Sequence, residues 1–246
     1  MPAAPAAECA RLIREARQIG VLTGAGISTS AGIPDFRGPR GLYVTRQYDP
    51  DKVFDIRHFI QDPVPFYEFA RDFLGLSGTL HPTPAHFFLA RLENLGQLAG
   101  IVTQNIDGFH HQAGSQNVFE MHGSFLQSFC LECRKPYSLN DLKEFLARPD
   151  APRCSCNGLI KPDIVFFGED VKYLRESEKL AEGSDLFFVI GSSCVVYPAA
   201  VVPTLCRGKI IIVNHDPVDI HGDIVLQVNR GADDFFNEVA SILEMA

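Results

Sequence analysis

Positive charge is scarce in this chain. Lysine and arginine together number 22 of the 246 residues, against 30 aspartate and glutamate residues, so the formal net charge is −8. A protein that binds nucleic acid by neutralising phosphates needs the opposite balance, and we therefore expect no direct nucleic-acid binding. The acidic excess instead favours approach by basic segments such as lysine-rich tails.

Targeting and membrane signals are lacking as well. Residues 1–7 have neither the basic start nor the apolar run of a signal peptide. Residues 186–206 carry no charge over 21 positions, which is long enough to span a bilayer. Pro198, Pro203 and a Gly-Ser-Ser break interrupt this stretch, so it predicts a strand, a loop and a short helix. We expect an intracellular protein, cytoplasmic or nuclear, with no membrane partner.

Internal repeats and low-complexity linkers are also missing. Hydrophobic residues make up 46% of the chain and charged residues 21%, values that exclude a disordered or collagen-like protein. The length corresponds to one large domain, or to one domain with an inserted module.

What the chain does contain is a series of short apolar strands that alternate with helices. This alternation is typical of a parallel sheet covered on both faces. The predicted fold class is therefore α/β, a doubly wound, Rossmann-like parallel sheet with an inserted small lobe. We expect strands at residues 19–23, 100–103, 118–121, 164–167, 185–190 and 209–213, and helices at residues 6–18, 64–74, 85–95, 173–182, 199–205 and 233–243.

Two segments interrupt the alternation. Residues 41–81 predict a helical module, residues 125–162 hold four cysteines, and we expect the two segments together to form a small domain. The large domain is then discontinuous, made of residues 1–40, 82–124 and 163–246. Ligands of open α/β sheets bind at the carboxyl ends of the strands, so the site should lie in a cleft between the two lobes.

A glycine turn at residues 24–26 follows the first predicted strand, and we expect a helix to continue through Ser28 and Ala31. Glycines let the backbone approach a pyrophosphate, and helix N-terminal N–H groups hold it. The third glycine of the dinucleotide pattern would fall at Thr29, so this turn alone leaves nucleotide binding and a plain tight turn equally open. The loop that follows, with Asp35, Phe36 and Arg37 side by side, is hard to explain by packing.

Polar residues also follow two later strands. Gln104, Asn105 and Asp107 suit a ribose or carboxamide ligand, although the same residues could form a polar loop in which Asp107 caps a helix. His122 precedes a glycine after a strand, a position that suits a general base, although most histidines in a chain are structural.

Four of the seven cysteines form two close pairs. Cys130-x-x-Cys133 and Cys154-x-Cys156 supply four thiolates, enough for a closed tetrahedral zinc site. Paired spacing without a secretory signal indicates metal binding rather than disulfides, and hence a reducing compartment. Because such a site has no open coordination position, one zinc ion per chain would be structural.

Together these segments resemble one family. GAGISTSAGIPDFRG at residues 24–38, TQNID at 103–107, the His-Gly pair, the cysteine quartet and KPDIVFFGE at 161–169 occur in the order seen in sirtuins. The resemblance implies an NAD-dependent protein lysine deacetylase that transfers the acyl group to the ADP-ribose of NAD and releases nicotinamide, deacylated lysine and O-acetyl-ADP-ribose. Its protein partners would be acyl-lysine segments, histone tails among them. The alternatives are a protein mono-ADP-ribosyltransferase, a long-chain deacylase with the same NAD site, or a non-catalytic NAD-binding protein.

The resemblance also implies a role for individual residues. The catalytic residues would be His122, Asn105 and Asp107. The acyl-lysine would contact Val165, Phe167, Gly168 and Glu169. NAD would be held by Gly24, Ala25, Gly26, Ser28, Ile33, Asp35, Phe36, Arg37, Gln104, Asn105, Ile106, Asp107, His122, Gly191, Ser192, Ser193, Asn214 and Ala232.

Two departures from the family pattern are informative. The second cysteine pair is one residue shorter than usual, which could weaken zinc binding. Sirtuins that remove succinyl or malonyl groups have a tyrosine followed three residues later by an arginine, whereas Tyr67 is followed at that spacing by Ala70, with Arg71 one residue beyond. Arg71 would be rotated by about 100° around a helix, so the segment resembles the deacetylase branch.

Overall fold

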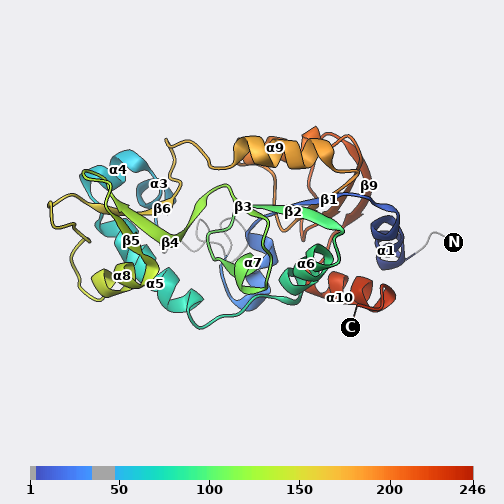
Figure 1. Cartoon of the computed structure of the whole chain (residues 1–246), viewed down its shortest axis with the longest axis horizontal. Helices are drawn as coiled ribbons and strands as arrows, with labels where there is room; N and C mark the ends of the chain where they lie inside the picture. The colour runs from blue at the N-terminus through green and yellow to red at the C-terminus, as the bar shows by residue number, and fades with distance from the viewer. Residues whose placement is uncertain (1–3, 35–47, 246) are drawn as a thin grey trace.

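The computed structural model describes residues 4–34 and 48–245 (Figure 1). Within these residues a six-stranded sheet has the order β3-β2-β1-β7-β8-β9, and all neighbouring strands are parallel. The strand order reverses between β1 and β7, which is where ligands of doubly wound folds bind. The strands are β1 (Ile19–Thr23), β2 (Leu98–Thr103), β3 (Val118–Glu120), β7 (Leu186–Ile190), β8 (Lys209–Val213) and β9 (Asp223–Val228).

Helices cover both faces of this sheet, as Figure 1 shows. Side chains such as Val21 and Phe188 pack on one face against α1 (Pro5–Glu15), α6 (Pro84–Asn94) and α10 (Ala232–Ile242). Their neighbours Leu22 and Phe187 pack on the other face against α9 (Leu174–Gly183) and the 3₁₀ helix η3 (Ala199–Leu205). Burial on both sides explains why the strands are continuously apolar. The predicted α/β fold is confirmed.

A second, antiparallel sheet has the order β5-β4-β6 within the part of the chain that is described. It lies at the other end of the molecule from α1 and α10 (Figure 1). Phenylalanines such as Phe59, Phe66 and Phe166 form a core between this sheet and nearby helices. The elements are β4 (Gly123–Cys130), β5 (Pro136–Ser138), β6 (Ile160–Ile164), α3 (Pro50–Val53), α4 (Ile56–Gln61), α5 (Val64–Ser77) and α8 (Leu139–Leu146).

The prediction of a strand at residues 164–167 is wrong. The strand is β6, which ends at Ile164 and pairs antiparallel with β4 in the small sheet. The residues after it form a loop, in which Phe167 makes an isolated parallel bridge with Asp55 and the Val165 backbone N–H donates to the carbonyl oxygen of His122 at 2.9 Å. Their apolar side chains pack into the aromatic core or line a neighbouring cavity, and the residues do not extend the β-sheet. The edge strand β9, which alternates exposed and partly buried positions, was not predicted.

The helix expected after the glycine turn is also wrong in type. Residues 25–31 form two single 3₁₀ turns, η1 (Ala25–Ile27) and η2 (Thr29–Ala31). Glycine, serine and threonine are weak helix formers, and Gly32 at φ 104° ends the second turn.

The uncharged residues 186–206 are divided between β7, a loop and η3, as expected. In the described part of the chain, no helix combines the length and the apolar character needed to cross a membrane.

Candidate active site

The carboxyl ends of β1, β2, β7 and β8 border a cavity of about 610 Å³, which is the size of a typical small-molecule site. The cavity extends to the loop after β6, so it lies between the two sheets. Of the predicted site residues, those that line it are Gly24, Ala25, Gly26, Gln104, Asn105, Ile106, His122, Val165, Phe167, Gly168, Glu169, Gly191, Ser192, Ser193 and Asn214.

The glycine turn packs directly against the turn after β7. The backbone N–H of Gly24 donates to the carbonyl oxygen of Ile190 at 3.0 Å, and that of Gly26 donates to Gly191 at 2.9 Å. A Cβ atom on Gly26 would lie 2.7 Å from the Cα of Gly191. Only glycine permits this approach, which brings the ends of β1 and β7 together at the switch point.

The segment after β2 is held by a second group of polar contacts. Asn105 donates from Nδ2 to the carbonyl oxygen of Gly24 at 3.2 Å and to Oγ of Ser28 at 3.3 Å. The Ser28 hydroxyl in turn donates to the Asp107 carboxylate at 2.7 Å. Ser28 therefore connects the glycine turn to both polar residues of the following loop.

A smaller cavity of about 30 Å³ adjoins the first and is lined by Ile33 and Asp107. Burial raises the pKa of Asp107, against the opposing effect of the Phe109 backbone N–H, which donates to it at 2.9 Å. Asp107 is not the cap of α7 (Phe109–Gln112), because the N-cap position is Gly108, but its carboxylate accepts the first backbone N–H of that helix and lines the smaller cavity.

His122 follows β3 and has a defined tautomer. Its Nδ1 lies 2.9 Å from the backbone carbonyl oxygen of Gln104, and because a carbonyl can only accept, Nδ1 carries the proton. Burial lowers the pKa of His122, although the Gln104 carbonyl acts in the opposite direction. The imidazole is therefore neutral at pH 7, with an unprotonated Nε2 on a residue that lines the cavity.

Gly123 explains why a glycine follows this histidine. Its φ of 68° is left-handed, and a Cβ atom there would lie 1.8 Å from the carbonyl oxygen of Asp163. The small sheet can therefore begin directly after His122 only with glycine at this position.

The loop after β6 forms the other wall of the cavity. Glu169 accepts the backbone N–H of Phe166 at 2.8 Å and pairs with the buried Lys161 at 2.9 Å. Its carboxylate therefore stabilises the loop, while Val165 and the half-exposed Phe167 provide apolar surface.

The lining of the two cavities does not account for every predicted site residue. Asp35, Phe36 and Arg37 fall outside the described residues. Ser28 and Ala232 are buried and line neither cavity.

Other cavity residues were missed. Tyr197 and Pro198 belong to the uncharged stretch after β7, whose lack of charge was a usable signal, whereas Phe54 has no local pattern that marks it. The unpredicted lining residues are Thr29, Phe54, Ile164, Phe166, Asp170, Val171, Leu174, Val196, Tyr197, Pro198, His215 and Asp216.

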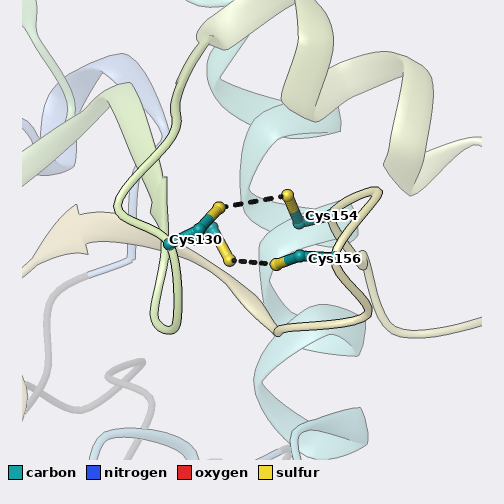
Figure 2. Close-up of side chains that lie close together, drawn as sticks. Cys130, Cys154 and Cys156 are labelled. Carbon is teal, nitrogen blue, oxygen red and sulfur yellow. Dashed lines mark hydrogen bonds between the residues drawn. The ribbon is translucent and has the colours of Figure 1, made fainter.

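The cysteine quartet converges on one point, and Figure 2 shows the side chains of Cys130, Cys154 and Cys156 close together. The sulfur atoms all lie within 4.8 Å of one another, with Cys130 to Cys156 at 3.5 Å and Cys133 to Cys154 at 3.6 Å. Four sulfurs around a tetrahedral zinc would be separated by about 3.8 Å, given a bond of about 2.3 Å. The arrangement fits a structural zinc, including the short second pair.

Comparison with known proteins identifies the family. A profile of the Sir2 family matches residues 24–198, which include the glycine turn, His122 and all four clustered cysteines. This chain belongs to the Sir2 family. An NAD-dependent protein deacetylase of Thermotoga maritima is 42% identical over 93% of this chain and 94% of its own. Another from Saccharolobus solfataricus is 45% identical over 83% of this chain and 84% of its own.

Solved Sir2 structures share the fold over nearly the whole length. A Sir2 complex with a p53 peptide and NAD⁺ has a TM-score of 0.88 and 39% identity, covering 97% of this chain and 98% of the other. A Sir2 protein bound to a propionylated peptide has a TM-score of 0.87 and 38% identity, covering 98% of this chain and 99% of the other.

Proposed function

We propose that this Sir2-family chain deacetylates protein lysines with NAD as co-substrate, and that His122 is the general base. The reaction converts NAD and an acetyl-lysine into nicotinamide, free lysine and O-acetyl-ADP-ribose. Family membership and deacetylase relatives that match most of the chain support the activity, which is that of an NAD-dependent protein deacetylase.

The geometry of His122 is the observation that carries the assignment of its role. Breaking the bond between nicotinamide and ribose develops positive charge on the sugar, and a ribose hydroxyl must then lose a proton to become a nucleophile. The unprotonated Nε2 of His122 can accept that proton, since Nδ1 is already bonded to Gln104. The base is neutral and oriented before any substrate binds.

Asn105 and Asp107 would contact the reacting end of NAD. Asn105 lines both cavities and Asp107 the smaller one, so a nicotinamide group placed there would meet an amide, a carboxylate and apolar Ile33. The rest of NAD would extend along the main cavity past the glycine turn, Gln104, Ser192 and Ser193, toward Asn214. The proposed NAD-binding residues also include Ser28, Asp35, Phe36, Arg37 and Ala232.

The acyl-lysine would enter beside the loop after β6. Val165, Phe167 and Gly168 line the cavity there, and Glu169 anchors the loop through Lys161. Substrates would be acyl-lysine segments of proteins, histone tails among them, because the net charge of −8 favours basic segments. A reducing compartment, cytoplasm or nucleus, would keep the four thiolates available for zinc.

We also propose a discontinuous large domain of residues 1–40, 82–124 and 163–246. Residues 41–81 and 125–162 would form the small domain. The separate aromatic core beside the antiparallel sheet supports this division. Zinc would hold the small domain together and take no part in the reaction, since four thiolates leave no coordination position for a substrate.

Mass spectrometry of an acetyl-lysine peptide incubated with NAD tests the function. We expect deacetylated peptide and O-acetyl-ADP-ribose in equal amounts. ADP-ribose attached to the peptide would indicate a mono-ADP-ribosyltransferase instead. Preferred turnover of a myristoyl-lysine peptide would indicate a long-chain deacylase.

A further inference from the structure

One charged side chain is buried behind the wall of the main cavity. Lys161 lies on β6, its side chain is only 8% exposed, and it lines neither cavity. Among the described residues it is the only lysine, arginine, aspartate or glutamate that is buried. Charged side chains are almost never buried unless they are paired, and replacing such a pair by apolar residues is often neutral or even stabilising. Stability alone therefore does not explain a lysine at this position.

The ammonium group of Lys161 has three protons, and three acceptors surround it. Its Nζ donates to the backbone carbonyl oxygen of Ile164 at 2.6 Å and to that of Pro162 at 3.4 Å. It also pairs with the carboxylate of Glu169 at 2.9 Å. The same Nζ lies 4.2 Å from the centre of the Phe166 ring, within the range of a cation–π interaction. One side chain thus joins the end of β6 to the far end of the loop that follows.

The loop that Lys161 closes contains a tight turn. The backbone N–H of Glu169 donates to the carbonyl oxygen of Phe166 at 3.0 Å, and the Phe166 N–H donates back to the Glu169 carboxylate at 2.8 Å. Gly168 lies within this turn at φ 94°, in the left-handed region that favours glycine. Phe167 and Gly168 both line the cavity. The carboxylate that Lys161 orients therefore fixes the turn that presents these two residues to the cavity.

The same loop is attached to the proposed base by its backbone. The Val165 N–H donates to the carbonyl oxygen of His122 at 2.9 Å. Phe167 donates its N–H to the carbonyl oxygen of Phe54 at 2.6 Å and accepts the N–H of Ile56 at 3.2 Å. A change in the shape of the loop would thus alter how the cavity wall lies relative to His122.

We propose that Lys161 is a positioning residue for the acyl-lysine, which it acts on only through the loop. By orienting Glu169, it holds Val165 and Phe167 at the place relative to His122 that the reaction needs. The inference rests on the proposed function, in which the acyl-lysine enters beside this loop. A merely structural lysine would affect stability alone, whereas a positioning lysine affects turnover of the peptide and leaves the use of NAD unchanged.

Hydrogen exchange of the free protein tests the effect of Lys161 on the loop without any substrate. Lys161→Met keeps the apolar length of the side chain and removes the ammonium group, so the Glu169 carboxylate can turn toward solvent and release the Phe166 amide. We expect that amide to exchange at least about tenfold faster than in the wild type, because it loses a hydrogen bond to a charged group. The Leu22 amide in β1 should keep its rate. An unchanged Phe166 rate, or equal acceleration at Phe166 and Leu22, would overturn the proposal.

Kinetics of Lys161→Met and Lys172→Met provide a matched comparison. Lys172 pairs with Asp163 across the same loop, but these two side chains are 31% and 37% exposed, and exposed pairs contribute little. We expect Lys161→Met to lower kcat/KM for an acetyl-lysine peptide by about tenfold or more, since a small misplacement of a reacting group is costly. Its KM for NAD, and both constants of Lys172→Met, should stay within about twofold of the wild type.

The double variant Lys161→Met/Glu169→Gln covers the case in which the single substitution prevents folding, because it leaves neither charge unpaired. It should show the same loss of kcat/KM as Lys161→Met, since the two residues act as one unit. Equal kcat/KM in Lys161→Met and Lys172→Met, or in the double variant and the wild type, would overturn the positioning role. Failure of the proposed function is a separate result, since the wild type would then show no deacetylation while the exchange rates would still decide the role of Lys161 in the loop.

Discussion

The imidazole of His122 donates its Nδ1 proton to the backbone carbonyl oxygen of Gln104 across 2.9 Å. The side-chain amide of Gln104 meanwhile donates to the Ser192 hydroxyl at 3.2 Å, so one residue orients the proposed base and joins the ends of β2 and β7. Because the group that accepts the Nδ1 proton of His122 is a main-chain carbonyl, replacing the Gln104 side chain should leave the tautomer of His122 unchanged.

Replacing His122 by alanine should reduce deacetylation by at least about 100-fold, because a positioned general base contributes a factor of that order. Zinc content and the circular dichroism spectrum should stay at wild-type values, since the ring lies at the cavity and not in the cysteine cluster. Steady-state rates with an acetyl-lysine peptide give the answer. A variant that keeps more than about a tenth of the wild-type rate would exclude His122 as the base.

The pH profile provides a second test of His122. Burial lowers its pKa below the ordinary histidine value of about 6.5, and only the neutral ring can accept a proton. The rate should therefore be constant around neutral pH and fall only below about pH 6.5. A profile of kcat/KM against pH, with enzyme stability checked at each point, measures this limb. An acidic limb centred above pH 7 would contradict the inferred neutral base.

Loss of one cysteine ligand should release the zinc. Metal analysis should find about one zinc per chain in the wild type and little in Cys133→Ser, which should also unfold at a lower temperature. Cys194→Ser is the control, because Cys194 lies outside the quartet, and it should keep its metal. Zinc loss in the control with retention in Cys133→Ser would show that the ligand set is wrong.

Acetyl-lysine should be preferred over succinyl-lysine. The guanidinium of Arg71 donates to backbone carbonyls at the end of α8, at 3.0 Å to Leu146 and 2.7 Å to Arg148. The buried Tyr67 donates its hydroxyl to the carbonyl oxygen of Ile160. Neither is available to a substrate carboxylate, which would then enter an apolar wall at a cost of several kcal/mol. We expect kcat/KM to differ by about 100-fold or more on one peptide with either acyl group. Equal turnover would show that a basic group reaches the acyl site.

Two buried histidines, His86 of α6 and His110 of α7, should make the protein sensitive to acid. Burial lowers the pKa of His86 to about 4, from an unfolded value of about 6.5, despite the nearby Asp233 carboxylate. Between these pH values the unfolded chain binds the proton and the folded chain does not, so stability falls as the pH falls through this window. From pH 7 to pH 5 the loss due to His86 alone is about 2 kcal/mol, and His110 acts in the same direction.

Urea unfolding at the two pH values measures this effect. In His86→Gln the loss of stability between pH 7 and pH 5 should be smaller than in the wild type. The exposed His81→Gln is the control and should match the wild type. An unchanged loss in His86→Gln would show that His86 does not stay neutral in the folded chain.

Several elements could be predicted because their cause is local. The strands at residues 19–23 and 209–213 have the predicted bounds, since each is a short, mostly apolar run buried on both faces and flanked on either side by a glycine or a polar residue. The convergence of Cys130, Cys133, Cys154 and Cys156 followed from thiol chemistry and spacing alone. The prediction of a strand at residues 164–167 failed because an aromatic core and a buried β-strand are both built from apolar residues, so the composition of this run does not distinguish them.

The amino-acid sequence by itself determined the α/β class, the cysteine ligands and the polar residues that follow the strands. Only the tertiary structure decided which of those residues meet, which nitrogen of His122 is free, and that Arg71 is occupied by carbonyls. It alone brought His86 and His110 from separate helices into contact with Thr83 and Thr23. The physical reason is that residue type and spacing report local geometry, whereas a hydrogen-bond network depends on strand order and helix packing between distant segments.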